Sequence, residues 1–184
     1  MLSIKKKDAE KRPFFMRLIG KYYLRNMKMR VGFGFDVHQL QEGLTFTLGG
    51  IQIPHTKGAL GHSDADVVIH AICDALLGAA GLKDIGFYFP DTSAEFKGID
   101  SKILLQRVMS LIEERGYSVG NVDVSLVLEK PKIKPHIDAM KTALAPIMKI
   151  EEADLSIKAT TNEKMGYVGR EEGVAAYAVV LIGT

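Results

Sequence analysis

The sequence contains one cysteine, no tryptophan and no apolar run long enough to cross a membrane. A single cysteine excludes an intramolecular disulfide, and Cys73 lies in an apolar segment, so we expect a packed thiol in a reducing, cytoplasmic setting. The missing apolar run argues against a membrane-spanning helix. With 184 residues, 47% of them hydrophobic, the chain is long enough for one domain with a sizeable core.

Charge is unevenly distributed along the chain. Residues 1–29 carry nine Lys or Arg and two acids, which leaves fifteen basic and twenty acidic residues for the remainder. An acidic body argues against nucleic-acid binding. The basic segment lacks the apolar core and cleavage site of a secretory signal, and it is not rich in serine. We therefore interpret residues 1–28 as a basic extension, disordered or created by an upstream start codon, and residues 29–184 as the domain. An organellar transit peptide is the alternative.

Hairpins interspersed with single helices predict an α+β fold, in which a mixed β-sheet has helices packed on one face. The last strand is apolar enough to be central and buried. The expected strands are 30–38, a hairpin of 44–48 and 51–53 around Gly49-Gly50, 119–128, 155–159 and 174–182. The expected helices are 66–80, 101–115 and 134–149, with a loop at 81–98. We expect Ser101 to cap the second helix and Pro146 to bend or shorten the third.

Asp36, His38 and His70 are the strongest candidates for metal ligands. Residues two apart in a strand point to the same face, so Asp36 and His38 can bind one ion from the same side. His70 lies in the first turns of the predicted helix at 66–80. Three protein ligands with an open position are typical of catalytic zinc, and Mn²⁺ or Co²⁺ would suit the same ligands. Taken singly, each residue is better explained as a turn cap or a satisfied polar group.

Three polar segments have the composition of phosphate-binding loops: 84–93, 129–135 and 158–170. The last combines backbone N–H groups, threonine hydroxyls and basic charges, which suit a phosphate. Its Glu163 offers an oxygen ligand for Mg²⁺. Each segment alone could equally be an exposed connector.

The ordered set of motifs from Met29 to the C-terminus closely resembles the 2-C-methyl-D-erythritol 2,4-cyclodiphosphate synthases of the non-mevalonate isoprenoid pathway. The segments that carry the resemblance are Gly34-Phe35-Asp36-Val37-His38, Gly61-His62-Ser63-Asp64, Asp74-Ala75-Leu76-Leu77-Gly78-Ala79, Asp84-Ile85-Gly86, Phe89-Pro90-Asp91-Thr92, Gly120-Asn121-Val122-Asp123 and Lys158-Ala159-Thr160-Thr161.

The resemblance implies a phosphorus–oxygen lyase that cyclises 4-diphosphocytidyl-2-C-methyl-D-erythritol 2-phosphate. The 2-phosphate attacks the β-phosphate and CMP leaves. Zn²⁺ on Asp36, His38 and His70 would polarise and position phosphates, while Glu163 would carry Mg²⁺ or Mn²⁺.

The same resemblance assigns the remaining site residues. His62 and Thr161 would stabilise the transition state, and the others would bind substrate. Asp36, His38 and His62 would also contact the substrate. The methylerythritol phosphate would be bound by Ser63, Asp84, Ile85, Gly86, Phe89, Pro90, Asp91, Thr92 and Ser93. The cytidine diphosphate would be bound by Leu128, Glu129, Lys130, Pro131, Lys132, Ile133, Lys134, Ala159, Thr160 and Thr161. Asn162, Glu163, Tyr167 and Arg170 would lie near the phosphates.

Family members are homotrimers, so the resemblance also implies a homotrimer with the sheets facing the three-fold axis and active sites between subunits. The extension is too short to be the cytidylyltransferase of bifunctional relatives, so we expect a monofunctional enzyme. Two alternatives remain open from the residues: a zinc phosphohydrolase that activates water, and a non-catalytic trimeric module that binds a phosphate ligand.

Overall fold

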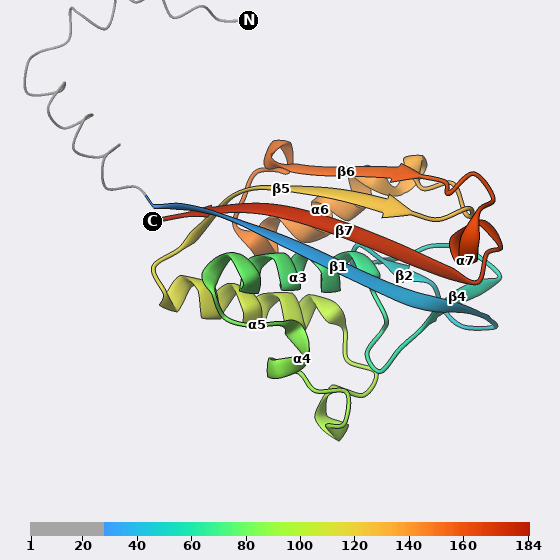
Figure 1. Cartoon of the computed structure of the whole chain (residues 1–184), viewed down its shortest axis with the longest axis horizontal. Coiled ribbons are helices and arrows are strands. Elements are labelled where there is room, and N and C mark those ends of the chain that lie inside the picture. The colour runs from blue at the N-terminus through green and yellow to red at the C-terminus, as the bar shows by residue number, and fades with distance from the viewer. Residues whose placement is uncertain (1–27) are drawn as a thin grey trace, which may run out of the picture.

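The computed structural model describes residues 28–184, so the structure of the predicted extension lies almost wholly outside the described residues (Figure 1). One five-stranded sheet, in the order β4-β1-β7-β5-β6, forms the centre of the molecule. A separate hairpin pairs β2 with β3. The strands are β1 (Met29–Glu42), β2 (Thr47–Leu48), β3 (Ile51–Gln52), β4 (Lys57–Leu60), β5 (Ser118–Val127), β6 (Leu155–Thr160) and β7 (Gly173–Gly183).

The sheet is mixed, as the sequence predicts. β7 runs antiparallel to both β1 and β5, whereas β6 runs parallel to β5. The predicted central strand is confirmed, because β7 lies between β1 and β5 and most of its side chains are buried. Strands β4 and β6 form the two edges.

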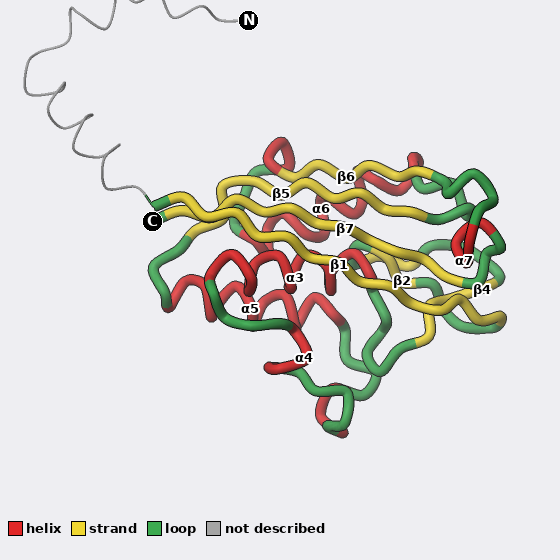
Figure 2. Tube along the Cα trace, viewed as in Figure 1, coloured by secondary structure: helices red, strands yellow, loops and turns green. Residues whose placement is uncertain are grey.

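The long helices α3 (Val67–Ala80), α5 (Ser101–Glu114) and α6 (Ile137–Met148) cover one face of this sheet (Figure 1). The shorter helices α4 (Ile85–Tyr88) and α7 (Gly166–Gly169) lie on connections between elements. Short 3₁₀ turns are η1 (Ala94–Phe96), η2 (Lys134–His136) and η3 (Glu152–Asp154). Figure 2 shows α3 and α5 below the long strands and α6 behind them, with α4 on the connection between α3 and α5. Within residues 28–184, no helix is long and apolar enough to cross a membrane.

Alternation along β1 separates its two faces. Val31, Phe33 and Val37 leave 68%, 63% and 44% of their surface exposed, whereas Gly32 and Gly34 are buried against α3. The exposed face therefore carries large apolar side chains, which is unusual for a sheet that faces only water.

Gly32 and Gly34 allow α3 to pack directly on β1. A Cβ atom at Gly32 would lie 1.8 Å from the carbonyl oxygen of Ala75, and one at Gly34 would lie 1.9 Å from that of Ala71. Only glycine permits so close an approach of the helix backbone. This contact places His70, on α3, beside Asp36 and His38 on β1.

The predicted cap of the second long helix was wrong. Asp100 is the N-cap of α5, and its carboxylate accepts a hydrogen bond from the backbone N–H of Lys102. Ser101 is instead the first helical residue, fully buried, and its hydroxyl is directed toward His70.

Other boundaries also differ from the sequence prediction. The predicted loop at 81–98 contains α4 and η1, and the predicted helix at 134–149 begins as a 3₁₀ turn before α6. Pro146 lies in the last turn of α6, and the helix continues past it to Met148. Strand β4 and helix α7 were not predicted, because each has only four residues and no clear periodicity.

Candidate metal centre and phosphate-binding pockets

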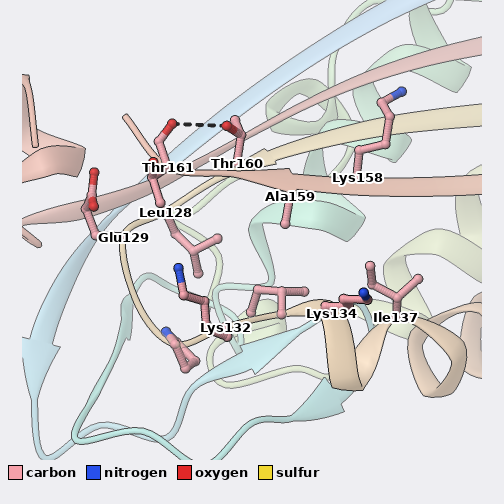
Figure 3. A pocket seen from close by; sticks show the side chains of 11 residues that line it. Leu128, Glu129, Lys132, Lys134, Ile137, Lys158, Ala159, Thr160 and Thr161 are labelled. Atoms are coloured by element: carbon pink, nitrogen blue, oxygen red, sulfur yellow. Dashed lines mark hydrogen bonds between the residues drawn. The ribbon is translucent and has the colours of Figure 1, made fainter. Parts of the chain in front are cut away.

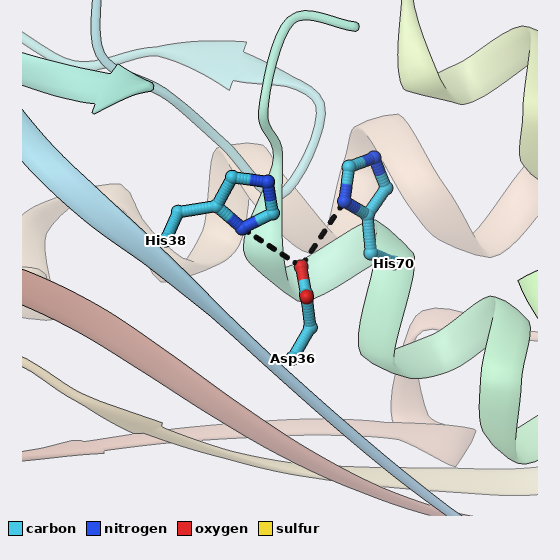
Figure 4. A group of neighbouring side chains, drawn as sticks. All are labelled: Asp36, His38 and His70. Atoms are coloured by element: carbon cyan, nitrogen blue, oxygen red, sulfur yellow. Dashed lines mark hydrogen bonds and ion pairs between the residues drawn. The ribbon is translucent and has the colours of Figure 1, made fainter. Parts of the chain in front are cut away.

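Asp36, His38 and His70 form the group that best fits a metal ion among the described residues. Each offers one ligand atom, and the three atoms lie within 4.8 Å of one another. Asp36 Oδ2 is 2.9 Å from His38 Nδ1 and 3.1 Å from His70 Nδ1 (Figure 4). The predicted convergence of strand and helix is confirmed.

The donor set fits a divalent cation. His38 Nδ1 is buried and close to Asp36, yet it makes no hydrogen bond of acceptable geometry. A buried nitrogen without a hydrogen-bond partner requires another explanation, and a metal ion supplies one. One carboxylate and two imidazoles suit Zn²⁺ and related first-row metals.

The electrostatics of the group are mutually stabilising. Burial alone would raise the pKa of Asp36, but the adjacent imidazoles of His38 and His70 outweigh it and lower the pKa to about 2. Burial acts to lower the pKa of His70, but the hydrogen bond and charge of Asp36 raise it overall, with help from Asp66 and Asp64. Asp36 is therefore an anion at neutral pH, as a metal ligand must be.

A cavity of about 570 Å³ opens above the three ligands. His62 and Ser63 line one side, and residues of the 84–93 segment line the other. The Nε2 of His62 donates to the carbonyl oxygen of Ser93 at 2.8 Å, which leaves Nδ1 as an acceptor in the neutral ring. Asp36, His38 and His62 line the cavity. From the set predicted to bind methylerythritol phosphate, it is lined by Ser63, Ile85, Gly86, Phe89, Pro90 and Asp91.

Three members of that predicted set do not line this cavity. Asp84 is the N-cap of α4 and accepts from the N–H of Phe87. Ser93 caps η1 and contributes its carbonyl to His62. Thr92 lies in the turn between them. In this chain these residues shape the loop around the cavity.

His70 makes two further polar contacts. Its Nε2 lies 3.0 Å from Ser101 Oγ and 3.1 Å from Ser63 Oγ. Ser101 in turn contacts both carboxylate oxygens of Asp64, through its hydroxyl and through its backbone N–H at 3.1 Å. Both ring nitrogens of His70 are therefore in polar contact, one on each side of the ring.

Asp66 fixes the beginning of α3. Its fully buried carboxylate accepts hydrogen bonds from the backbone N–H groups of Gly49, Gly50, Val68 and Ile69. Burial raises the pKa of Asp66, and these donors act in the opposite direction. The side chain thus joins the β2–β3 turn to the helix that carries His70.

A second pocket, of about 340 Å³, lies at the ends of β5 and β6 (Figure 3). Lysine side chains surround it, together with the threonine pair at the end of β6. From the set predicted to bind cytidine diphosphate, it is lined by Leu128, Glu129, Pro131, Lys132, Ile133, Lys134, Ala159, Thr160 and Thr161. Lys130 does not line it and instead pairs with Glu171 at 2.8 Å.

The loop after β6 is held by Glu129. Its Oε1 accepts from the backbone N–H groups of Asn162 and Lys164. Glu163, between them, adopts a positive φ of 51° and accepts from the Thr161 hydroxyl at 3.3 Å. Tyr167 belongs to α7, and Arg170 pairs with Glu172. Asn162, Glu163, Tyr167 and Arg170 lie outside the lining of both pockets. The two pockets share no lining residue.

Comparison with known proteins identifies the family. A sequence model of the YgbB family matches residues 29–183. The chain belongs to the YgbB family.

Curated YgbB relatives carry one name. The 2-C-methyl-D-erythritol 2,4-cyclodiphosphate synthase of Cytophaga hutchinsonii is 64% identical over 156 residues, which are 85% of this chain and 98% of that protein. The counterpart from Bacteroides thetaiotaomicron is 60% identical over the same length. The resemblance found in the sequence motifs is confirmed.

Solved YgbB structures share the fold. A 2C-methyl-D-erythritol-2,4-cyclodiphosphate synthase in a CDP-bound form aligns with a TM-score of 0.77 at 39% identity, over 83% of this chain and 99% of that one. The bifunctional IspDF from Campylobacter jejuni aligns with a TM-score of 0.83 at 39% identity over 86% of this chain. The chain spans 43% of the length of that bifunctional protein.

Sequence analysis did not predict the carboxylates and the hydroxyl that support His70 and its helix. Asp66 contacts the helix that carries His70, Ser101 contacts His70, and Asp64 contacts Ser101. Asp74 accepts from the backbone N–H of Ile85 at 2.7 Å. The Asp64-Ala65-Asp66 string before an apolar helix indicates a cap, but nothing in it specifies Ser101 as a partner thirty-seven residues away.

Proposed function

We propose that this chain is a cyclodiphosphate synthase, a phosphorus–oxygen lyase that converts 4-diphosphocytidyl-2-C-methyl-D-erythritol 2-phosphate to 2-C-methyl-D-erythritol 2,4-cyclodiphosphate and CMP. The observation that carries the proposal is the convergence of Asp36, His38 and His70 below a cavity, in a chain of the YgbB family. Curated relatives bear the name of this synthase.

In this proposal Asp36, His38 and His70 hold Zn²⁺, and Glu163 holds Mg²⁺ or Mn²⁺. Bound there, the metals would supply Lewis-acid polarisation of phosphate oxygens. Attack of one phosphate on another brings like charges together, so catalysis depends on positioning and on compensating charge. The positioning at the metal end would come from residues that line the same cavity, namely His62, Ile85, Gly86, Phe89, Pro90 and Asp91.

The second pocket is the proposed binding site for the cytidine diphosphate. Lys132 and Lys134 provide positive charge there, and Thr160 and Thr161 provide hydroxyl groups. Support comes from the CDP-bound relative, which shares the fold over 83% of this chain. Lys130, Asn162, Tyr167 and Arg170 are assigned to the neighbourhood of the phosphates, where rearrangement of the Lys130–Glu171 and Arg170–Glu172 pairs would free their cations.

A homotrimer would bring the metal group and the lysine-rich second pocket together in one active site. Within one chain the metal group and the lysine-rich pocket share no lining residue, although one substrate must reach both. The exposed apolar face of β1 offers a surface for association, with Val31 and Phe33 among its members. We propose that these faces meet around a three-fold axis and that each active site lies between subunits.

Residues 29–184 form the proposed synthase domain, preceded by a basic extension at 1–28. The family match begins at residue 29. The single cysteine, Cys73, is buried and unpaired, which suits a reducing compartment, and we propose the cytoplasm.

Steady-state release of CMP from the substrate tests the proposal. His62→Ala and Thr161→Ala should lower kcat by about 10²–10³, a typical effect of removing one group that stabilises the transition state, while bound zinc stays at the wild-type level. Ser110→Ala is the matched control, because this exposed serine on α5 donates only to the carbonyl of Gln106. Release of inorganic phosphate, or of CMP without a cyclic product, would favour a phosphohydrolase. Unchanged substrate with metal bound would favour a non-catalytic module.

A further inference from the structure

Ser101 is a fully buried hydroxyl between an imidazole and a carboxylate. Its Oγ lies 3.0 Å from His70 Nε2 and is hydrogen-bonded to Asp64 Oδ1. A buried hydroxyl has one proton to donate and lone pairs that accept, so the direction of each hydrogen bond can be assigned.

Asp64 determines that direction. A carboxylate accepts hydrogen bonds only, and Asp64 accepts from the backbone N–H of Ser101 through Oδ2 and from the Ser101 hydroxyl through Oδ1. The hydroxyl proton is therefore committed to Asp64. A lone pair of Ser101 Oγ then faces His70 Nε2, which must carry a proton in order to donate to it.

A neutral imidazole protonated on Nε2 presents an unprotonated lone pair on Nδ1. In His70 this is the nitrogen that lies 3.1 Å from Asp36 Oδ2, on the side of the candidate metal group. Without metal, Nδ1 donates a proton to the Asp36 carboxylate, and a bound metal would displace that proton and leave the ring protonated on Nε2. We infer that Asp64 and Ser101 are positioning residues, which fix the ring orientation and tautomer of His70 so that Nδ1 binds the metal. Carboxylate-to-histidine hydrogen bonds commonly do this at metal sites, and here a serine hydroxyl lies between the two.

Ser63 does not perform the same role, although its Oγ is also 3.1 Å from His70 Nε2. Its hydroxyl accepts from the backbone N–H of Ala65 and makes no hydrogen bond to a carboxylate. Its Oγ also lies 3.4 Å from Ser101 Oγ, and because the Ser101 proton goes to Asp64, Ser63 is the donor in that pair. The directional constraint on His70 therefore comes from Ser101.

The inference rests on the proposed metal site and is tested without turnover. Zinc affinity is measured by competition with a chromophoric chelator in the full-length protein. Ser101→Ala and Asp64→Asn should each weaken zinc binding by about 10- to 100-fold, the usual effect of removing such a partner. Asp64→Asn keeps the side-chain shape, but its amide donates to Ser101 Oγ and reverses the hydrogen bond to His70. Asp100→Ala, which removes the neighbouring α5 cap without touching His70, should leave the affinity unchanged.

Histidine ¹⁵N NMR of zinc-loaded wild-type protein supplies a second readout that does not depend on a variant's folding. The resonances of His70, identified by their loss in His70→Ala, should show a protonated Nε2 and a metal-bound Nδ1. Metal on Nε2, or wild-type affinity in both Ser101→Ala and Asp64→Asn, would overturn the positioning role alone. Equal zinc binding by wild-type protein and Asp36→Ala would overturn the metal site together with it.

Discussion

Gly34→Ala should disrupt the metal centre without altering any ligand. A Cβ at residue 34 would lie 1.9 Å from the carbonyl oxygen of Ala71, and such contacts essentially never fall below 3.0 Å. Helix α3 must therefore move away from β1 by about 1 Å, or the strand must bend. Because His70 precedes Ala71 directly, its ring moves away from Asp36 on the opposite element.

The expected effects on stability and on zinc affinity follow from two general magnitudes. Overpacking of a close contact costs about 1–3 kcal/mol of unfolding free energy. Metal–ligand distances tolerate only about 0.2 Å, so a displacement of about 1 Å removes His70 from the ligand set. We expect zinc affinity to fall by at least the roughly 10- to 100-fold seen when a supporting hydrogen bond is removed.

Chelator competition measures the zinc affinity, and urea denaturation of the metal-free protein measures the unfolding free energy. Gly78→Ala is the matched control on the same helix, because a Cβ there meets nothing closer than the Phe33 carbonyl oxygen at 4.0 Å. Alanine in a helix interior should raise stability by about 0.5–1 kcal/mol and leave zinc affinity unchanged. Wild-type zinc affinity in Gly34→Ala would refute the reasoning that glycine positions the ligands.

Three further predictions concern Asp36, Cys73 and Asp74. In metal-free protein the lowered pKa of Asp36 contributes stability that is present above its unfolded pKa near 4 and lost as pH falls through about 2. Asp36→Asn should therefore cost roughly 2 kcal/mol of unfolding free energy at pH 6 and less than about 0.5 kcal/mol at pH 2, measured by urea denaturation. An equal cost at both pH values would contradict this. Burial raises the pKa of the Cys73 thiol well above its usual value, so iodoacetamide at pH 8 should label it only in denaturant, and rapid labelling of native protein would show that the helix is not packed as described. Asp74→Ala should speed hydrogen exchange at the Ile85 amide, measured by NMR, because that N–H loses its 2.7 Å acceptor; exchange at the wild-type rate would mean that the bond does not hold α4.

Periodicity and local spacing were sufficient to predict the architecture of the long elements. Strand β1 and helix α3 each have a repeating apolar pattern over at least nine residues, so both were predicted, and Asp36 and His38 could be placed on one face of the strand. The elements that escaped prediction are short, such as β4 and α7, where tertiary contacts rather than periodicity determine the structure.

The hydrogen bonds that link Ser101 to Asp64 and His70 could not be predicted from the spacing of residues in the sequence. Ser101 follows Asp100 at the beginning of α5, and both residues are common helix caps, so the sequence alone does not show which one turns inward. That choice depends on α3 and α5 packing together, which brings Asp64 and His70 to Ser101. The separation of the two pockets likewise becomes visible only once β5 and β6 are placed in the sheet.

The central claim is that this chain cyclises its substrate, and ³¹P NMR tests it most directly. Purified protein is incubated with 4-diphosphocytidyl-2-C-methyl-D-erythritol 2-phosphate, Zn²⁺ and Mg²⁺, and the phosphorus resonances are followed over time. The account predicts paired diphosphate resonances of a cyclic product that grow together with CMP and disappear in Asp36→Ala. Inorganic phosphate, a linear diphosphate or unchanged substrate with zinc bound would contradict it.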